Sequence, residues 1–400
     1  IMLLARFLSK LFSKEGIVLV DSQDQKYICG EVSNKEKPLT LKLLKKDLNW
    51  KLLIYPELYL GEEYFKGNIE IINGSIHDFL NLTFKNIGRG KINTYSTIIN
   101  NLMYAWKFLT SYNFPGAAKK NVEMHYNRGE DIYDWMLDQE HRQYSCGIFK
   151  NSNESLEQAQ TNKLSHIAKK LDLKPGHSVL DIGCGWGGLS RYLAKLSGCQ
   201  VHGVTLSSNQ LAHCKEKARE SKLDNLLSYE LCDYRNVTGK YDRLTNIGFL
   251  EHVSPKFYKT FFKKISDLMK DDAICLTHTI ASTKTPHPGN PFISKYIFSG
   301  GKIPVASQLT KAIEQTNLVI SGWESLIDHY NLTLDQWRKR FLENAGKAKK
   351  KYGNEFVRLW DFYLSSCSAS FKWADLLVYQ IEIVKNFSST PSRTRDYIYQ

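Results

Sequence analysis

The sequence predicts an α/β protein, with a doubly wound parallel sheet in the second half of the chain and a small N-terminal α+β domain before it. Three observations predict this class. An apolar, β-branched run at 178–182 leads directly into a glycine-rich turn that opens a helix. Strand-like runs recur near residues 200, 226, 242 and 273, with helical patterns between them. The 400 residues, 42% of them hydrophobic, suffice for two domains.

The first hundred residues alternate short strand-like and helical patterns, which is typical of a small α+β module. The strand-like runs fall at 16–20, 39–44 and 69–72. A polar bridge that contains Pro115-Gly116 follows. We therefore predict an N-terminal domain over 1–115 and a second domain over 116–400.

The N-terminal residues 2–14 carry an apolar helical stripe of Leu4, Phe7, Leu8 and Leu11. This stripe has two interpretations: a helix that lies in the lipid interface, or an amphipathic helix that packs on its own domain. Because most such stripes cover a core, we favour packing. The stretch lacks the uninterrupted apolar run and cleavage site of a signal peptide.

After residue 280 the chain leaves the alternating pattern. A Pro/Gly-rich stretch over 285–301 precedes segments, expected to be helical, that contain Trp323, Trp337, Trp360 and Trp373. We predict that about 281–375 forms a helical cap over the ligand site. The four tryptophans are assigned no individual role, because such side chains are more often ordinary core than ligand wall.

The glycine-rich turn indicates a small-molecule site. Gly183, Gly185 and Gly188 satisfy G-x-G-x-x-G, which fits both a dinucleotide and S-adenosylmethionine (SAM). Asp181, two residues before the first glycine, is typical of SAM-dependent methyltransferases. The second strand ends in Thr205, where a dinucleotide enzyme carries an acidic residue. These neighbours favour SAM, although Thr205 is unusual for methyltransferases as well.

Eight short motifs occur in order along the second half of the chain: HYN at 125–127, YSC at 144–146, LEQAQ at 156–160, the glycine turn, GVTLS at 203–207, EHV at 251–253, HTI at 278–280 and KYIF at 295–298. Over roughly 117–380 they resemble cyclopropane-fatty-acyl-phospholipid synthases, members of the mycolic acid cyclopropane synthase-like family. The first hundred residues more loosely resemble the extra domain of the phospholipid-acting members. The resemblance implies a class I SAM-methyltransferase fold with a helical lipid-binding cap.

The resemblance further implies a SAM-dependent transferase. Such an enzyme transfers a methylene from SAM to the cis double bond of unsaturated phospholipid acyl chains and forms a cyclopropane ring. Methyl transfer to an alkene builds a carbocation, which a base must deprotonate in a cavity that excludes water. In the family that base is a bound bicarbonate. The alternative is a related fatty-acyl C-methyltransferase that leaves a methyl or methylene branch. A non-catalytic or RNA-directed SAM-binding protein is a second rival.

By the same resemblance, five residues surround the bicarbonate. Glu251 orients its hydroxyl and offsets positive charge, His278 and Tyr330 donate or relay hydrogen bonds, and Cys146 and the Ile280 backbone complete the pocket. Taken alone, each of the first three has a structural explanation: a residue of a helical first turn, a core histidine and plain packing. The segment before Tyr330, at 321–326, departs from the family pattern.

The resemblance supplies the remaining site residues. Cys367 matches a cysteine once regarded as catalytic, and an inert buried thiol is the alternative explanation. Glycines allow close approach to SAM, and polar side chains reach its ribose, methionine and adenine. The implied SAM-binding set is Tyr144, Ser145, Asp181, Gly183, Cys184, Gly185, Thr205, Leu206, Gln210, Asp233, Tyr234 and Gly248.

A formal net charge of +13, with a basic cluster over 338–351, implies an anionic partner. An anionic membrane surface and nucleic acid both fit, but the aromatic residues do not interleave with the basic ones, so we favour the membrane and expect no nucleic acid. Eight scattered cysteines without C-x-x-C predict no metal and a reducing cytosol. We expect a cytoplasmic protein, peripherally bound to the inner face of the membrane, and by resemblance a homodimer.

Overall fold

The computed structural model describes residues 2–88, 129–283, 289–298, 300–387 and 394–399. The chain divides into two compact units. The N-terminal unit combines Ile1–Met103, His287–Ser299 and Leu334–Leu376, and the catalytic unit combines Tyr104–Pro286, Gly300–Thr333 and Leu377–Gln400. The predicted boundary at residue 115 and the motif at 125–127 lie outside the described residues.

The N-terminal unit contains a four-stranded sheet in the order β2-β1-β3-β4. Its strands are β1 (Ile17–Val20), β2 (Lys26–Cys29), β3 (Thr40–Leu43) and β4 (Ile69–Ile72). β1 and β3 run parallel, and the other pairs are antiparallel. The sequence indicated three of these strands and missed β2, because only its last residue is buried and its exposed side chains show no apolar pattern.

Helices α1 (Met2–Leu11), α2 (Leu48–Ile54), α3 (Pro56–Phe65) and α4 (Ile76–Ile87) complete the module. The α1 stripe packs on its own domain, since Leu4 and Leu8 are buried with Phe12 in the core. This confirms the packing interpretation for most of the stripe. Phe7, however, stays 38% exposed and Leu3 stays 55% exposed.

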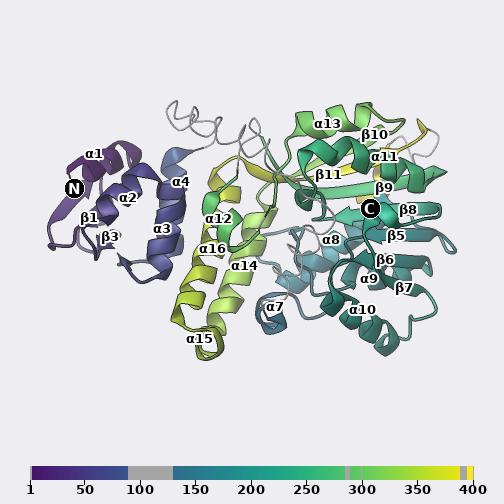
Figure 1. Ribbon diagram of the computed structural model, residues 1–400, viewed down its shortest axis with the longest axis horizontal. Helices are drawn as coiled ribbons and strands as arrows, with labels where there is room; N and C mark the ends of the chain where they lie inside the picture. The colour runs from purple at the N-terminus through teal and green to yellow at the C-terminus, as the bar shows by residue number, and fades with distance from the viewer. Residues whose placement is uncertain (1, 89–128, 284–288, 299, 388–393, 400) are drawn as a thin grey trace. The chain divides into compact units, whose positions relative to one another are not determined.

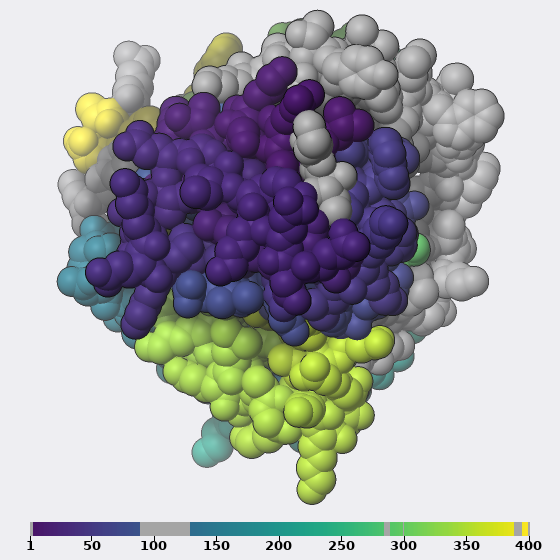
Figure 2. Space-filling model, turned by 90° about the vertical axis from the view of Figure 1, so that its left-hand side faces the viewer, coloured from purple at the N-terminus to yellow at the C-terminus, as the bar shows by residue number. Residues whose placement is uncertain are grey.

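Part of the predicted cap belongs to the N-terminal unit. α12 (Pro291–Tyr296), α15 (Ala345–Tyr352) and α16 (Asn354–Trp373) lie in it, and the division between units falls within α14 (His329–Glu343). Arg358 of α16 donates to the carbonyl oxygens of Tyr64 and Ile69. Figure 2 faces this unit, with the purple surface of the first residues against the yellow-green surface of the later helices.

The catalytic unit contains a seven-stranded sheet in the order β10-β11-β9-β8-β5-β6-β7. Five parallel strands confirm the predicted doubly wound sheet: β5 (Ser178–Ile182), β6 (Gln200–Thr205), β7 (Leu227–Leu231), β8 (Tyr241–Ile247) and β9 (Met269–Ser282). An antiparallel pair, β10 (Val319–Leu326) and β11 (Leu376–Val384), extends it.

The sequence did not indicate that antiparallel pair, and Trp323 lies in strand β10 rather than in a helix as expected. β10 is an edge strand whose residues are mostly half-buried, so it lacks a clear two-residue alternation. β11 is buried along almost its whole length although it carries the polar residues Gln380 and Glu382, so its pattern of polar and apolar residues does not reflect its burial.

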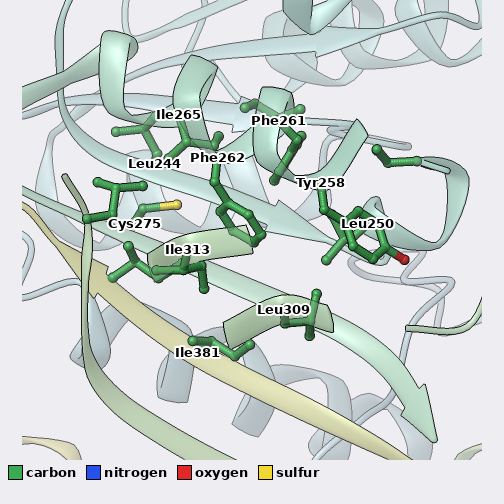
Figure 3. Close-up of a cluster of buried hydrophobic side chains, with 14 of the residues drawn as sticks. Leu244, Leu250, Tyr258, Phe261, Phe262, Ile265, Cys275, Leu309, Ile313 and Ile381 are labelled. Carbon is green, nitrogen blue, oxygen red and sulfur yellow. The ribbon is translucent and has the colours of Figure 1, made fainter. Parts of the chain in front are cut away.

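Helices cover both faces of this sheet (Figure 1). α8 (Leu156–Lys170), α9 (Gly188–Ser197) and α10 (Ser208–Glu220) pack on one face. α11 (Tyr258–Leu268) and α13 (Ala306–Glu314) pack on the other. Figure 3 shows this second layer, where Phe262 and Ile265 of α11 lie near Leu309 and Ile313 of α13. None of the helices that the structure describes is long and apolar enough to cross a membrane.

Candidate active site

The glycine-rich turn connects the end of β5 to α9. Neighbouring residues pack directly against its backbone, where a side chain would otherwise lie. Gly183 has a φ of +74°, and a Cβ atom there would lie 2.6 Å from the Phe249 ring. A Cβ on Gly188 would lie 2.0 Å from the carbonyl oxygen of His141. Larger residues therefore do not fit at these two positions.

Asp181 lies beneath this turn. Its carboxylate accepts hydrogen bonds from Ser190 Oγ at 2.7 Å and Thr245 Oγ1 at 2.9 Å. Burial raises the pKa of Asp181, and the two hydrogen bonds and the charge of Lys163 oppose that rise. Through these hydrogen bonds Asp181 joins β5, β8 and α9.

A cleft opens at the carboxyl ends of β5, β6 and β8, where ligands bind in sheets of this kind. Its lining includes eight residues of the predicted SAM-binding set: Gly183, Gly185, Thr205, Leu206, Gln210, Asp233, Tyr234 and Gly248. Tyr144, Ser145, Asp181 and Cys184 are described but are not in that lining. Their contact with SAM stays a prediction.

Side chains in the cleft are fixed by local hydrogen bonds. Thr205 Oγ1 donates to Gln210 Oε1 at 2.7 Å. Arg235 donates to both carboxylate oxygens of Asp233, at 2.8 and 2.6 Å, which occupies much of that side chain. The rings of Tyr234 and Phe249 meet edge to face, with centroids 5.4 Å apart. The cleft thus offers an apolar aromatic wall beside ordered polar groups.

Glu251 lies just after β8, in the short helix η2 (Leu250–His252). Its Oε1 accepts a hydrogen bond from the backbone N–H of Ile280 at 2.5 Å. Its Oε2 is buried and has no hydrogen-bond partner among the described residues. Burial raises the pKa of Glu251 to about 7, although the Ile280 N–H opposes this rise. A carboxylate with an unsatisfied buried oxygen is a ready acceptor for a ligand hydroxyl.

His278 lies on β9, two residues before Ile280, so both side chains project to the same side of the strand. Its carbonyl oxygen accepts from the N–H of Gly248 at 2.8 Å, which ties β9 to the loop that leads to Glu251. Gln380 Nε2 lies 3.1 Å from His278 Nδ1. Burial lowers the pKa of His278 well below its usual range, and Lys163 acts in the same direction. The imidazole is therefore neutral at neutral pH.

Cys146 lies on a segment bonded to the start of α14. The N–H of Gly147 donates to Thr333 Oγ1 at 3.0 Å, and the N–H of Phe149 donates to His329 Nδ1 at 3.2 Å. Tyr330 lies between these two partners in the sequence, so the segment and Tyr330 share one neighbourhood. Burial raises the pKa of Cys146 to about 12, which keeps its thiol protonated.

Comparisons with known proteins show the family to which this chain belongs. A family model described as mycolic acid cyclopropane synthetase matches residues 115–381. The chain is also 32% identical, over 94% of its length and 92% of the other chain, to the cyclopropane-fatty-acyl-phospholipid synthase of Escherichia coli. The chain belongs to the cyclopropane synthase family. It is a SAM-dependent methyltransferase.

Two further relatives show the range of this cyclopropane synthase family. A crystal structure of a mycolic acid cyclopropane synthase complexed with SAH and CTAB is 29% identical, with a TM-score of 0.63, over 66% of this chain and 97% of that one. Sphingolipid C9-methyltransferase A of Emericella nidulans is 31% identical over 82% of this chain and 65% of its own. These comparisons confirm the class I methyltransferase fold and the use of SAM.

Cys367 lies on α16, in the N-terminal unit. Burial raises the pKa of Cys367 to about 12, so it is a thiol rather than a thiolate. A protonated thiol is a poor nucleophile. This fits the alternative of an inert structural cysteine.

Sequence reasoning did not single out four polar residues of the catalytic unit: His252, which lines the cleft, and the buried residues Lys163, Lys170 and Gln380. Burial lowers the pKa of Lys163 to about 7, and its Nζ donates to Gln143 Oε1 at 2.6 Å and to Ser145 Oγ at 2.9 Å. The spacing of the two lysines, seven residues apart on one helix, is the sequence signal that was available.

Proposed function

We propose that this protein transfers a methylene from SAM to the cis double bond of unsaturated acyl chains in membrane phospholipids and forms a cyclopropane ring. The observation that carries the proposal is the half-buried Glu251, just after β8, together with the buried His278 on the neighbouring strand β9. Gly248, which lines the SAM cleft, is hydrogen-bonded to His278. A methyl donor in the cleft therefore lies close to an acidic and an imidazole side chain.

The proposed SAM contacts follow from the cleft. Gly183 and Gly185 bring the backbone close to the ligand, and the N-terminus of α9 adds its positive partial charge. The Thr205 and Gln210 pair reaches the ribose and methionine portions. Tyr234 and Phe249 flank the adenine, and Asp233 reaches its amino group while it holds Arg235.

The chemistry places demands on the buried residues. Methyl transfer to an alkene creates a carbocation, which water would trap as an alcohol. Glu251 offsets that charge, and its burial keeps the surrounding cavity poor in water. The high pKa of the Cys146 thiol keeps it from competing as a nucleophile.

The residues present fit a bound bicarbonate. The unpartnered Glu251 Oε2 accepts its hydroxyl group, and the neutral His278 donates an N–H to one of its oxygens. Cys146, Tyr330 and the Ile280 backbone complete the pocket. When bound, bicarbonate would supply the base that removes a proton from the transferred methyl group.

The product identifies the reaction. Purified protein is incubated with unsaturated phospholipid vesicles and methyl-deuterated SAM, and the acyl chains are analysed by mass spectrometry and proton NMR. We expect an added CD₂ group and the high-field proton signals of a cyclopropane in the unlabelled product. Activity in carbon-dioxide-free buffer should fall and should return when bicarbonate is added. An unchanged acyl chain contradicts the proposal.

The relationship to a sphingolipid methyltransferase favours one second candidate, a fatty-acyl C-methyltransferase. The carbocation then loses a proton from the chain rather than from the new methyl group, or shifts a hydride first. A methyl branch retains three deuterium atoms. A methylene branch retains two but shows olefinic instead of cyclopropane protons, so the same experiment separates the three products.

The N-terminal unit offers a surface for membrane association. Leu3 and Phe7 on α1 are exposed, as are Trp50 (61%) and Ile54 (76%) on α2, and α1 packs against α2. Each pair is four residues apart, so it lies on one side of its helix. Exposed cations flank both helices: Arg6, Lys10, Lys14, Lys45 and Lys46. Exposed apolar side chains with adjacent cations suit an anionic lipid surface.

Vesicle sedimentation tests this docking. We expect the protein to bind vesicles that contain phosphatidylglycerol more tightly than neutral ones, and the double variant Trp50→Ala and Ile54→Ala to bind several-fold less, since each lost apolar side chain removes about 1.5–3 kcal/mol at most. Leu196→Ala, at a 58% exposed position on α9, is the control. Equal losses in both variants contradict the surface. The molecular mass of the protein in solution tests the proposed homodimer. Fractionation of cells tests whether the protein is cytoplasmic and bound to the inner face of the membrane.

A further inference from the structure

Two lysines of α8, Lys163 and Lys170, are fully buried and lie on one side of that helix. Lys163 and Lys170 both have 0% exposed surface, and both lower the pKa of His278. Burying an ammonium group is unfavourable unless hydrogen bonds compensate it. Lys170 donates to Glu324 Oε2 at 2.5 Å and to Gln380 Oε1 at 2.8 Å. The contact with Gln380 leads directly to His278.

Gln380 connects the lysine to the histidine. It lies on β11 with 0% exposed surface, and its carboxamide contacts Lys170 at one end and His278 Nδ1 at the other. An ammonium group has only donors, so the carboxamide oxygen must face Lys170. The NH₂ end then faces Nδ1, which must accept the hydrogen bond.

His278 is neutral because burial, and then the charges of Lys163 and Lys170, lower its pKa well below the usual range. A neutral imidazole carries one proton, on either Nδ1 or Nε2. Because Nδ1 accepts from Gln380, the proton is on Nε2. The chain of hydrogen bonds therefore selects one of two tautomers.

Two acidic side chains near Lys170, those of Glu324 and Glu382, stabilise its positive charge. Glu324 accepts from Lys170 and also lies 2.7 Å from His166 Nε2, and Glu382 lies 3.7 Å from Lys170 Nζ. Burial alone raises the pKa of Glu324, but the hydrogen bond to His166 and the charge of Lys170 outweigh it and bring the pKa to about 2. Glu324 is therefore a carboxylate that keeps Lys170 in the donor-only form.

We propose that Lys170 and Gln380 are positioning residues that hold His278 as the Nε2–H tautomer, so that a neutral donor is presented to the anion in the reaction site. This inference rests on the proposed function of His278. In the opposite tautomer, the Nε2 lone pair would face the anion and repel it. The two residues act through His278 and touch neither SAM nor the acyl chain.

Gln380→Glu tests the proposal with little change in shape. A carboxylate at this position still pairs with Lys170 but can only accept, so the His278 proton moves to Nδ1. We expect ¹⁵N NMR of the histidine-labelled full chain to show this change. In the variant, Nδ1 of His278 should give the signal of a protonated nitrogen and Nε2 that of an unprotonated one, the reverse of the parent. The kcat should fall by about 10²-fold, as when one donor to a reacting anion is removed, with unchanged SAM affinity. His278→Gln identifies the signals among the 11 histidines.

Lys170→Met is the second variant. It removes the donor that orients the carboxamide, so both tautomers should appear and kcat should fall less than in Gln380→Glu. Gln315→Glu, the same substitution at an exposed position of the catalytic unit, is the matched control and should keep the parental tautomer. An Nδ1–H signal in the parent, or parental signals and kcat in Gln380→Glu, overturns the proposal. The tautomer is measured without substrate, so a different acyl product would overturn the proposed function alone.

Discussion

The cleft at the carboxyl ends of β5, β6 and β8 and the buried site around His278 lie in the same unit but are built in different ways. The cleft lining runs from Ile182 to Thr260, a short stretch of the chain, and combines glycines and aromatic rings with aliphatic and polar side chains. The His278 site combines polar side chains from β9, β11 and α8, which are far apart in the sequence. In the second site, removal of Lys170 or Gln380 leaves a buried hydrogen-bond partner unsatisfied.

Glu251→Gln is the substitution from which we expect the largest difference between the two regions. We expect kcat to fall by about 10²–10³-fold, comparable to loss of a group that stabilises charge in a transition state. SAM affinity, measured by calorimetry, should not change, because Glu251 does not belong to the cleft lining. An equal loss of SAM affinity would show that the two regions are not independent.

Glu251→Gln should also change how the free energy of unfolding depends on pH. Burial raises the pKa of Glu251 to about 7 from 4.5, so its contribution to stability is complete at low pH and is lost as the pH rises through 7. Glutamine stays neutral. The free energy of unfolding of Glu251→Gln should therefore exceed that of the parent near pH 8. At about 1.4 kcal/mol per pKa unit, the difference is on the order of 3 kcal/mol, and it should narrow toward low pH.

Denaturant unfolding across this pH range measures the gap. The exposed Glu36 provides the matched control, because Glu36→Gln replaces a carboxyl that water solvates. A gap that stays constant with pH, or that widens as the pH falls, would contradict the assignment of a buried, proton-binding carboxyl to Glu251.

The smallest effect is expected in the cleft. Gly183→Ala places a methyl group 2.6 Å from Phe249 at a φ of +74°, and we expect SAM affinity to fall about tenfold, or about 1.4 kcal/mol. Gly198→Ala is the control, since Gly198 also has a positive φ, +66°, but a Cβ there meets no atom within 4 Å. The control should lose stability without losing SAM affinity. Equal affinity losses would contradict the close-approach role of Gly183.

The sequence determined the features that depend on neighbouring residues. The strand and turn pattern around Gly183 predicted the parallel sheet and the cleft, because turn chemistry and side-chain periodicity are local properties. The motifs placed Glu251, His278 and Ile280 near one another, since β8 and β9 pair side by side. The strands β10 and β11 were not predicted, because the residues of β10 are mostly half-buried and because the polar residues of β11 are buried together with its apolar ones.

Only the tertiary structure decided the protonation and orientation of the buried groups. Lys170, Gln380 and His278 are separated by about a hundred residues or more from one another, and no local pattern indicates that they form one hydrogen-bonded chain. Their charge state depends on burial, which arises when α8 packs on the sheet. Likewise, Asp181 matches a motif, but its hydrogen bonds to Ser190 and Thr245 place it beneath the cleft rather than on its wall.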